Sequence, residues 1–350
     1  MTIREKIEDG EHVFLEEWAA KADESLGRAE AEEPDAIRTC YMRDRDRIIH
    51  SKSFRRLKHK TQVYLSTGND HYRTRLTHTL EVSQISRTVG RALGLNLDLI
   101  EAVALGHDVG HTPFSHSGES VLDALLPGGF NHQANSVRVL TLLEEGSRGR
   151  GLNLTRETLD GILNHRGMEA QGRKDLTLEG QTVRFSDKIA YVQHDIDDSI
   201  RAGLLKSDEI PQDLRDRLGD THSRRISTLI EDMIYHNLPR LRAGERELEL
   251  SGDVMTAFQR LRQFMFDRVY KGDYCLRQQQ KAAYVVKFVF EYFYQNPHKM
   301  PALYRKTAEE DGAARGAADY ISGMTDRYCI DLFQSLTVPA PMWEPGMETR

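Results

Sequence analysis

Apolar residues recur at intervals of three and four along almost the whole chain. Val82, Ile85 and Val89 show this spacing. Similar spacing runs through residues 121–145, 156–165, 180–201, 224–237, 254–267, 279–294 and 313–336. An α-helix returns to the same face every 3.6 residues, so the pattern predicts helices that each bury one side. Alternating patterns are confined to a short candidate strand pair near 61–66 and 71–73. We therefore predict an all-α helical bundle.

The length of 350 residues suits one large domain with an appended lobe, or two modest domains. We predict an N-terminal helical extension (1–40), a core (41–240), a C-terminal helical lobe packed on the core (241–336) and an irregular tail (337–350). The charged, turn-rich stretches 203–223 and 305–312 are predicted to be exposed connections. The tail carries three prolines, which favour irregular structure.

Composition excludes several classes of protein. The chain has no apolar run near the ~20 residues that a membrane span needs, and no signal-peptide pattern at its N-terminus. Its three cysteines are odd in number and widely separated, which argues against a disulfide framework or a cysteine-type zinc site. We therefore expect a protein of the reducing cytoplasm that does not contact membranes. The net charge of -6 argues against a general nucleic-acid binder.

Basic residues are concentrated in one segment of this acidic chain. Between Arg38 and Lys60 there are nine basic residues and only two acids, Asp44 and Asp46. Such a segment is most often solvated surface. It also suits a small polyanion or a stretch of single-stranded nucleic acid, and both interpretations stay open.

Metal-ligand side chains fall on the apolar faces of three predicted helices. His78 lies four residues before Val82, and His107 follows an apolar run on the next helix. Asp187 projects from the buried face of a third helix. A buried carboxylate is costly without a cation or several donors, which applies to Asp108 and Asp187. One inward histidine is usually a hydrogen-bonded core residue. Two imidazoles and two carboxylates together suit a divalent ion with open positions for water and substrate.

The order H…HD…D resembles the signature of the HD superfamily of metal-dependent phosphohydrolases. Within it, the chain is similar to the bacterial deoxynucleoside triphosphate (dNTP) triphosphohydrolases, the dGTPase-like proteins. The matching stretches are RDRDRIIHSKSFRRLKHKTQV (43–63), RTRLTHTLEVSQI (73–85), LGHDVGHTPFSHSGE (105–119), FSDKIAYVQHDIDD (185–198) and DYISGMTDRYCI (319–330). HD alone is a weak motif, but the five stretches in this order are specific. The resemblance implies an HD-domain helical bundle.

The resemblance also implies the reaction and the metal ligands. His78, His107, Asp108 and Asp187 would hold one divalent ion per subunit. Mn²⁺, Mg²⁺, Fe²⁺, Co²⁺ and Ni²⁺ all suit this set, and Zn²⁺ fits but has no thiolate to favour it. The attacked atom would be the α-phosphorus of a dNTP, with dGTP the favoured substrate. The products would be a deoxynucleoside and inorganic triphosphate.

A catalytic pair is expected beyond the HD motif. We expect Gly110 and Pro113 to end the helix, so that the chain turns over the ion and returns His116 and Glu119 to the site. By resemblance this pair is catalytic, the carboxylate supporting an imidazole that moves a proton. Which of the two transfers which proton is left open. His111 either contacts phosphate or the leaving group, or only orders the loop.

The resemblance further implies contacts to the substrate. Phosphate-binding positions match Arg75, Lys188 and, more loosely, His132. Tyr191 would block the space of a 2′-hydroxyl, Asp195 would hold the 3′-hydroxyl, and Gln62 would assist at the sugar. Each has an ordinary structural alternative: Tyr191 as a core residue, for example, and Asp195 as an ion-pair partner. We see no chemical role for GMTDRY (323–328), which we expect to pack the C-terminal lobe on the core.

Two other functions compete with this one. Another HD nucleotide hydrolase would share the metal ligands but not the continuation HTPFSHSGE. A nucleotide or single-stranded-DNA sensor would bind through the 38–60 segment without hydrolysis. A P-loop NTPase is excluded because GxxxxGK[ST] does not occur. The resemblance also implies a homo-oligomer, with a hexamer favoured, in which a regulatory dNTP can bind at subunit interfaces.

Overall fold

The computed structural model describes residues 1–62, 73–146, 149–167 and 177–339. Within these ranges the chain forms sixteen α-helices and one two-stranded antiparallel sheet, so the all-α prediction is confirmed. The helices are α1 (Ile3–Phe14), α2 (Cys40–His50), α3 (Lys52–Arg56), α4 (Arg75–Ala92), α5 (Leu97–Gly106), α6 (His116–Leu125), α7 (His132–Arg138), α8 (Arg156–Leu163), α9 (Leu178–Arg201), α10 (Gln212–Leu218), α11 (His222–Arg242), α12 (Gly252–Met265), α13 (Asp273–Gln295), α14 (Ala302–Asp311), α15 (Ala313–Ser322) and α16 (Asp326–Thr337). The strands are β1 (Glu145–Gly146) and β2 (Gly149–Arg150).

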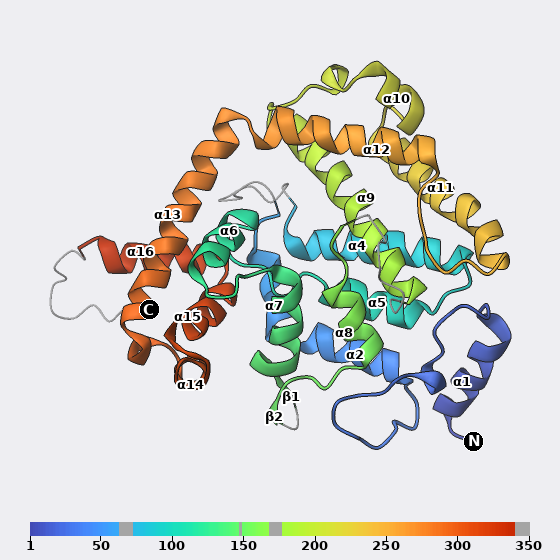
Figure 1. The fold of residues 1–350 in the computed structure, drawn as a ribbon, viewed down its shortest axis with the longest axis horizontal. Coiled ribbons are helices and arrows are strands. Elements are labelled where there is room, and N and C mark those ends of the chain that lie inside the picture. Colours follow the sequence, from blue (N-terminus) through green and yellow to red (C-terminus); the bar gives the residue numbers. More distant parts are fainter. Residues whose placement is uncertain (63–72, 147–148, 168–176, 340–350) are drawn as a thin grey trace, which may run out of the picture.

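Helices α4, α5 and α9 pack against one another at the centre of the larger hydrophobic cluster (Figure 1). The α5 sequence LDLIEAVALG is apolar almost all round, which is typical of a helix enclosed on every side. Accordingly Leu99, Ile100 and Val103 are fully buried, with α2 packed on α5 and with α8 and α11 against α9. Side-chain caps set where these helices begin. Thr74 accepts the Thr77 N–H at the start of α4.

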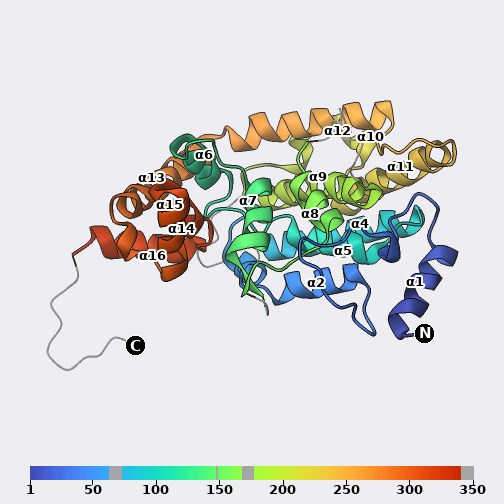
Figure 2. The ribbon, with the colours of Figure 1, turned by 60° about the horizontal axis from the view of Figure 1, so that its bottom comes forward.

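A second hydrophobic cluster joins α6 to the C-terminal helices. Leu122 of α6 is buried with Val286 and Phe290 of α13, Ile321 of α15 and Cys329 of α16. Figures 1 and 2 both show α6 beside α13, although more than 140 residues separate them in the chain. The helix α12 belongs instead to the first cluster, with α9 and α10. The domain boundaries given above stay predictions, because a hydrophobic cluster is not by itself a folding unit.

Several local predictions differ from the structure. The stretch 203–223, expected to be an exposed connection, contains α10, and the stretch 305–312 overlaps the later part of α14. The helix α10 buries Leu214 and Leu218, because its two apolar residues lie one turn apart. The helix predicted for 121–145 is interrupted by an irregular segment at 126–131 that carries Gly128 and Gly129 at positive φ. Part of the candidate strand pair is an isolated bridge between Thr61 and Thr74, and residues 63–72 lie outside the described ranges. So do residues 340–350 of the tail.

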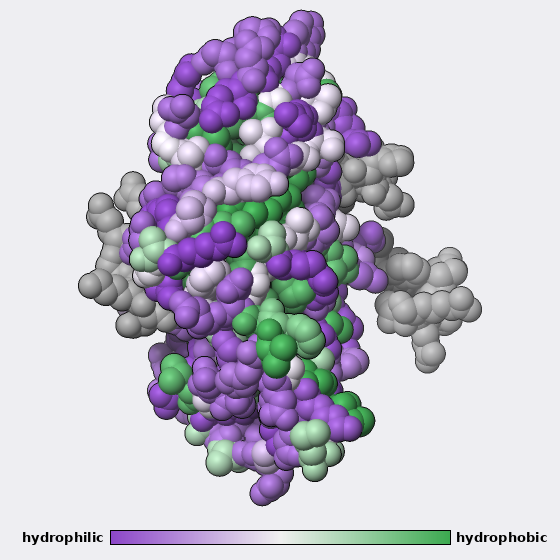
Figure 3. Space-filling view, turned by 90° about the vertical axis from the view of Figure 1, so that its right-hand side faces the viewer, coloured by the Kyte–Doolittle hydropathy of each residue, from purple (hydrophilic) through white to green (hydrophobic). Residues whose placement is uncertain are grey.

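The surface is mixed in character. Figure 3 shows a face on which hydrophilic side chains cover the two ends and apolar side chains gather in a band across the middle. None of the helices in the described ranges has the length and apolar character needed to cross a bilayer. All three cysteines are free, and Cys275 and Cys329 are buried.

Glu179 of α9 is a buried acid, and its ionised form should destabilise the folded state. Its Oε1 accepts the N–H groups of Ala20 and Asn96 at 3.0 Å, while its Oε2 has no hydrogen-bond partner among the described residues. Burial raises the pKa of Glu179 from 4.5 to about 7. The folded state therefore holds this proton more tightly than the unfolded state, and stability falls as pH rises from about 4.5 to about 7.

We expect Glu179→Gln to remove this part of the pH dependence. Between pH 5 and pH 8 the free energy of unfolding of the native protein should fall by about 3 kcal/mol more than that of the variant. Urea unfolding at both pH values measures the difference, with Glu17→Gln, at an exposed site, as the control. An equal fall in the free energy of unfolding between pH 5 and pH 8 in all three proteins would mean that ionisation of Glu179 does not destabilise the folded state.

Candidate functional site

Four ligand-type side chains meet where α4, α5 and α9 pack together. His78 lies on α4, His107 and Asp108 directly follow α5, and Asp187 lies on α9. The His78 Nε2 atom is 3.2 Å from Asp187 Oδ1 and 3.7 Å from Asp108 Oδ2. The His107 Nε2 atom is 3.4 Å from Asp108 Oδ1 and 3.9 Å from Asp187 Oδ1. All four side chains are buried. The structure thus brings together the four residues that the sequence predicted as metal ligands.

The hydrogen bonding of His107 indicates that this cluster fits a cation. Its Nδ1 lies 2.6 Å from the carbonyl oxygen of Ala104, which can only accept, so Nδ1 carries the proton. The Nε2 atom then presents a lone pair. It is buried and has no hydrogen-bond partner among the described residues. A lone pair directed at the oxygens of Asp108 and Asp187 is repulsive unless a cation lies between them. The site can therefore hold a divalent metal ion.

A second layer of side chains supports His78. Its Nδ1 lies 3.4 Å from Nδ1 of His194 on α9, and the His194 Nε2 atom in turn contacts the Glu81 carboxylate of α4. Burial lowers the pKa of His194 to about 4. Groups that hold the back of a metal-binding imidazole fix its ring orientation, so His194 and Glu81 are suited to aim the His78 Nε2 atom at the cluster.

The two carboxylates of the cluster also have cationic partners. The Arg75 guanidinium donates to Asp108 Oδ2 at 2.6 Å, and the Lys188 ammonium donates to Asp187. Burial opposes the charge of Asp187, but Lys188 beside it holds the pKa of that carboxyl well below its usual value. Arg75 and Lys188, predicted as phosphate-binding residues, thus also brace the carboxylates in this structure.

The loop between α5 and α6 differs in one respect from the prediction. The helix α5 ends at Gly106, four residues earlier than expected, and Gly110 has a packing role instead. A Cβ atom on Gly110 would lie 2.1 Å from the backbone nitrogen of Ser136 on α7, so only glycine fits there. Phe114 and Ser115 have φ values of 60° and 56°. Each such residue costs roughly 1–3 kcal/mol, so the surrounding contacts must hold this turn.

The predicted catalytic residues meet at the start of α6. Glu119 accepts hydrogen bonds from the His132 backbone N–H and from His132 Nδ1, both at 2.9 Å. The same carboxylate lies 3.2 Å from His116 Nδ1. The rings of His111 and His132 are stacked with centroids 3.7 Å apart, and His111 Nε2 lies 3.2 Å from Asp108. The His116 side chain is 78% exposed, so it lies at the rim of the site rather than within it.

Electrostatics distinguish the members of this group. Burial opposes the charge of Glu119, but its hydrogen bonds to His116 and His132 hold the pKa of Glu119 well below its usual value. Burial lowers the pKa of His132 even though Glu119 beside it acts in the opposite direction. Glu119 is therefore an anion that orients two imidazoles, one buried and one exposed.

His165 is a site residue that the sequence analysis missed. It follows α8, is buried, and its Nδ1 donates to the carbonyl of Ile162 at 2.7 Å. Its Nε2 then faces His132 Nε2 at 3.3 Å, and its ring centroid lies 5.0 Å from that of His107. The available signal was a histidine directly after the amphipathic stretch 156–163. That signal does not say which neighbours the helix end will meet.

The two predicted sugar-binding residues have partners from distant segments. The Arg262 Nε of α12 donates to the Tyr191 hydroxyl at 2.8 Å, and the Tyr270 hydroxyl donates to Asp195. Burial raises the pKa of Asp195 to about 7. Gln62 is half-buried, and its Oε1 has no hydrogen-bond partner among the described residues. The described contacts do not link Gln62 to the histidine and aspartate cluster.

The basic segment 38–60 is extensively paired within the chain. Arg43 and Arg47 both contact Glu32, and Arg45 contacts Asp98. The segment is therefore less cationic in the folded protein than its sequence indicates, because these carboxylates offset its charge.

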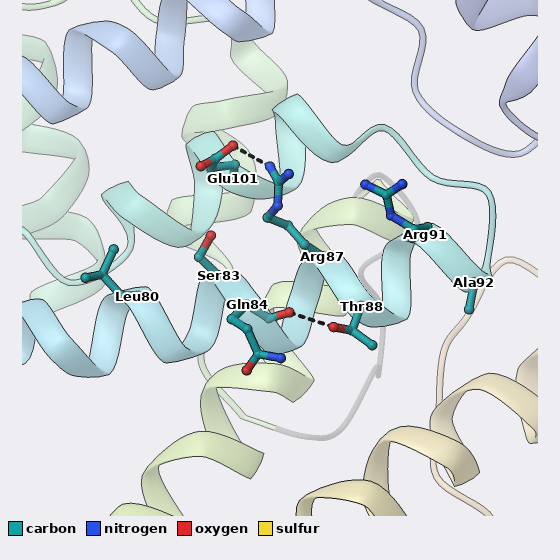
Figure 4. Close-up of a pocket in the computed structure, with 8 residues that line it drawn as sticks. All are labelled: Leu80, Ser83, Gln84, Arg87, Thr88, Arg91, Ala92 and Glu101. Carbon is teal, nitrogen blue, oxygen red and sulfur yellow. Dashed lines mark hydrogen bonds and ion pairs between the residues drawn. The ribbon is translucent and has the colours of Figure 1, made fainter.

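A surface hollow of about 690 Å³ lies along α4, with Glu101 of α5 at its edge (Figure 4). It is lined by Leu80, Ser83, Gln84, Arg87, Thr88, Arg91, Ala92 and Glu101. Arg87 is paired with Glu101, and Thr88 donates to the Gln84 carbonyl (Figure 4). None of the residues predicted for the site lines this hollow, so it is separate from the metal-binding cluster.

Two family profiles match the chain. The HD domain matches residues 75–192, a range that contains all four predicted ligands, and a phosphohydrolase-associated domain matches residues 248–335. A deoxyguanosinetriphosphate triphosphohydrolase-like protein of Clostridium perfringens is 54% identical over 339 residues, 97% of this chain and 98% of that one. The chain belongs to this family.

Other deoxyguanosinetriphosphate triphosphohydrolase-like proteins match as fully. The protein from Clostridium tetani is 54% identical over 343 residues, and that from Caldanaerobacter subterraneus is 53% identical over 347 residues, 99% of both chains. A solved phosphohydrolase from Bacteroides thetaiotaomicron aligns with 84% of this chain at 16% identity and a TM-score of 0.49, and the assignment does not depend on it. As a member of this triphosphohydrolase-like family, the protein is a hydrolase of the HD class.

Proposed function

We propose that the protein hydrolyses dNTPs at the α-phosphate, with dGTP favoured, and releases a deoxynucleoside and inorganic triphosphate. The observation that carries this proposal is the His107 Nε2 atom, which has no hydrogen-bond partner among the described residues and faces two buried carboxylates. Beside it, Glu119 orients the imidazoles of His116 and His132. A cation site next to proton-transfer groups is what a metal-assisted phosphoester hydrolase needs. The family membership supports the same reaction class.

In this proposal His78, His107, Asp108 and Asp187 hold one divalent ion per subunit. Mn²⁺, Mg²⁺, Fe²⁺, Co²⁺ and Ni²⁺ suit two imidazoles and two carboxylates, and Zn²⁺ is less favoured without a thiolate. When bound, such an ion lowers the pKa of water and neutralises charge on the attacked phosphoryl group.

The chain's own residues supply the remaining steps. Glu119 holds the His116 imidazole at the rim, where it transfers a proton to or from a reacting oxygen. His111 and His132 line the space next to Asp108 and are suited to donate to phosphate oxygens. Arg75 and Lys188 add positive charge where the triphosphate is negative.

The proposed sugar contacts explain how ribonucleotides would be rejected. Arg262 holds the Tyr191 ring, which in this proposal would fill the space that a 2′-hydroxyl needs. Asp195 would accept from the 3′-hydroxyl in competition with its present partner Tyr270. A fixed ring that excludes the 2′-hydroxyl does not clash with a deoxynucleotide. It therefore rejects ribonucleotides without weakening the binding of dNTPs.

Product analysis by chromatography tests the proposed function. Each of the four dNTPs, and GTP, would be incubated singly and as a mixture with the protein and Mn²⁺ or Mg²⁺. We expect deoxynucleoside and intact triphosphate from dNTPs and no products from GTP. Turnover only in the mixture would indicate an activating dNTP. Release of orthophosphate or pyrophosphate would exclude the proposed reaction, and binding without turnover under every metal would favour a nucleotide sensor.

Tyr191→Ala tests the source of the sugar selectivity. We expect GTP hydrolysis to rise by roughly 10-fold or more relative to dGTP hydrolysis, because the ring no longer fills the 2′ position. Tyr235→Ala, which removes a 75% exposed ring from α11, serves as the matched control. Unchanged selectivity in Tyr191→Ala would assign discrimination to other residues and leave Tyr191 a packing role.

Assembly and regulation complete the proposal. A homo-oligomer is proposed, with a hexamer favoured, and a regulatory dNTP or single-stranded DNA would bind through the 38–60 segment. Occupation of that segment by a polyanion would compete with ion pairs such as Arg43 with Glu32. Light scattering of the protein alone and with added dNTPs measures both the assembly and its dependence on nucleotide.

A further inference from the structure

We propose that Asp326 of the segment GMTDRY (323–328) is a positioning residue for the catalytic pair. In this role it ties the C-terminal helices to the turn from which α6 begins, and so fixes His116 and Glu119 relative to the metal ligands. The proposal rests on the proposed function for the roles of those two residues. The segment has no other role in the reaction as described above.

The proposed machinery is divided between the two hydrophobic clusters. The metal ligands lie on α4 and α9 and directly after α5, and apolar residues of these three helices belong to the first cluster. His116 and Glu119 lie on α6, whose Leu122 is buried in the second cluster with α13, α15 and α16. Figure 1 shows α6 on the side of the C-terminal helices, away from α4 and α9. The distance between the catalytic pair and the ligands therefore depends on how the two clusters are held together.

Asp326 makes a direct connection between them. It is the first residue of α16 and is 8% exposed. Its Oδ2 accepts the backbone N–H of Thr61 at 2.8 Å, and its Oδ1 accepts the backbone N–H of Phe114 at 2.9 Å. Both carboxylate oxygens thus accept backbone N–H groups from other segments. One of these N–H groups lies before α4 and the other lies just before α6. A carboxylate that accepts two buried N–H groups is a strong and geometrically specific link.

The turn that Asp326 holds is the strained one. Phe114 and Ser115 both have positive φ, and α6 begins at the next residue, His116. Two side chains also hold this turn: the Thr112 hydroxyl donates to the Ser115 carbonyl at 2.9 Å, and the Arg75 guanidinium donates to the Ser115 hydroxyl at 2.6 Å. Phe114 is also buried in the second cluster, and the carbonyls of Phe114 and Ser115 accept backbone N–H groups of α6. Without the bond to Phe114, a strained turn relaxes toward ordinary backbone angles and carries the start of α6 with it.

Lys60 provides a second link in parallel. Its buried ammonium donates to the carbonyl of His111, in the catalytic loop, and to the carbonyl of Ser322 at 2.7 Å, at the end of α15. The adjacent residues Lys60 and Thr61 therefore contact both the catalytic loop and the C-terminal helices. With Asp326 they form a clasp, which we define as Lys60, Thr61 and Asp326 with their backbone partners.

The clasp predicts a specific effect of Asp326→Asn. One amide oxygen replaces two carboxylate oxygens, so one backbone N–H faces an NH₂ group that cannot accept. With dGTP and Mn²⁺ we expect kcat to fall about 100-fold. The KM and the Mn²⁺ affinity should stay within about twofold, because the described hydrogen bonds of Asp326 go to Thr61 and Phe114 and to none of the four ligands. Hydrogen exchange should quicken in residues 111–118 and not in α4 or α9.

Two further variants provide a control and a substitute for Asp326→Asn. Asp331→Asn, on the exposed side of the same helix, is the matched control and should leave every measurement unchanged. Thr112→Val removes a bond within the turn without touching the C-terminal helices, so it should reproduce the faster exchange and part of the loss in kcat. It serves in place of Asp326→Asn if that variant does not fold.

The outcomes separate this proposal from the proposed function. Unchanged exchange of residues 111–118 in folded Asp326→Asn would overturn the positioning role, whatever the activity. Parallel loss of Mn²⁺ affinity, thermal stability and kcat would also overturn it, because Asp326 would then be a general structural residue. If the native protein does not hydrolyse dNTPs, the proposed function fails, while the exchange and Mn²⁺ measurements still decide on the clasp.

Discussion

Asp187→Ala is expected to abolish hydrolysis, lowering kcat by more than about 10³-fold, and to remove tight binding of a divalent ion. Asp187 is the ligand that lies nearest to His78 and also faces His107, so its loss opens one side of the cluster. It also leaves the Lys188 ammonium at the cluster without its carboxylate partner. A positive charge at that position opposes the binding of a cation.

Calorimetric titration with Mn²⁺ and turnover of a dNTP mixture measure the two effects. The control is Asp197→Ala on the same helix. The Asp197 carboxylate lies farther along α9 than Asp187, and it faces His222 rather than a member of the cluster. That control should keep both metal affinity and activity. Retained Mn²⁺ affinity in Asp187→Ala would mean that Asp187 is not a required ligand, since His78, His107 and Asp108 alone, or Asp108, His111 and His132, could also hold the ion.

His116→Ala is expected to lower kcat by roughly 10²–10⁴-fold with little change in metal affinity or stability. The His116 side chain is largely exposed and touches Glu119, so its removal leaves no cavity in the core. A loss of activity without a loss of stability is the signature of a group that acts on the substrate. Turnover, Mn²⁺ titration and thermal unfolding of the same preparation provide the three measurements.

A comparison with His132→Ala decides which imidazole transfers the proton. His132 is buried and contacts Glu119 at 2.9 Å, whereas His116 is exposed and contacts it at 3.2 Å. If His116 acts, its variant loses the pH dependence of kcat and the His132 variant mainly raises KM. The reverse pattern would contradict the assignment of His116. Ser120→Ala, one turn along the exposed side of α6, should leave both parameters unchanged.

The helical periodicity of the sequence predicted the all-α fold and the inward direction of His78, His107 and Asp187. These are local properties, because spacing along one helix decides which side is buried. Where the local signal was weak, as in the short helix α10, the prediction was wrong. The spacing of three residues allowed Glu119 to support His116, and the resemblance supplied the catalytic role of the pair. The contact of Glu119 with His132 became visible only in the folded chain.

Only the tertiary structure decided which helices meet. It placed α6 with α13 and α16, brought His165 beside His132, and directed both oxygens of Asp326 to backbone groups more than 200 residues away. Periodicity identifies a buried face but not the partner that buries it, because packing joins any surfaces of matching shape. The sequence by itself therefore determined the helices and the chemistry available on each. The relative positions of the metal cluster and the catalytic pair depend on long-range packing and on the clasp.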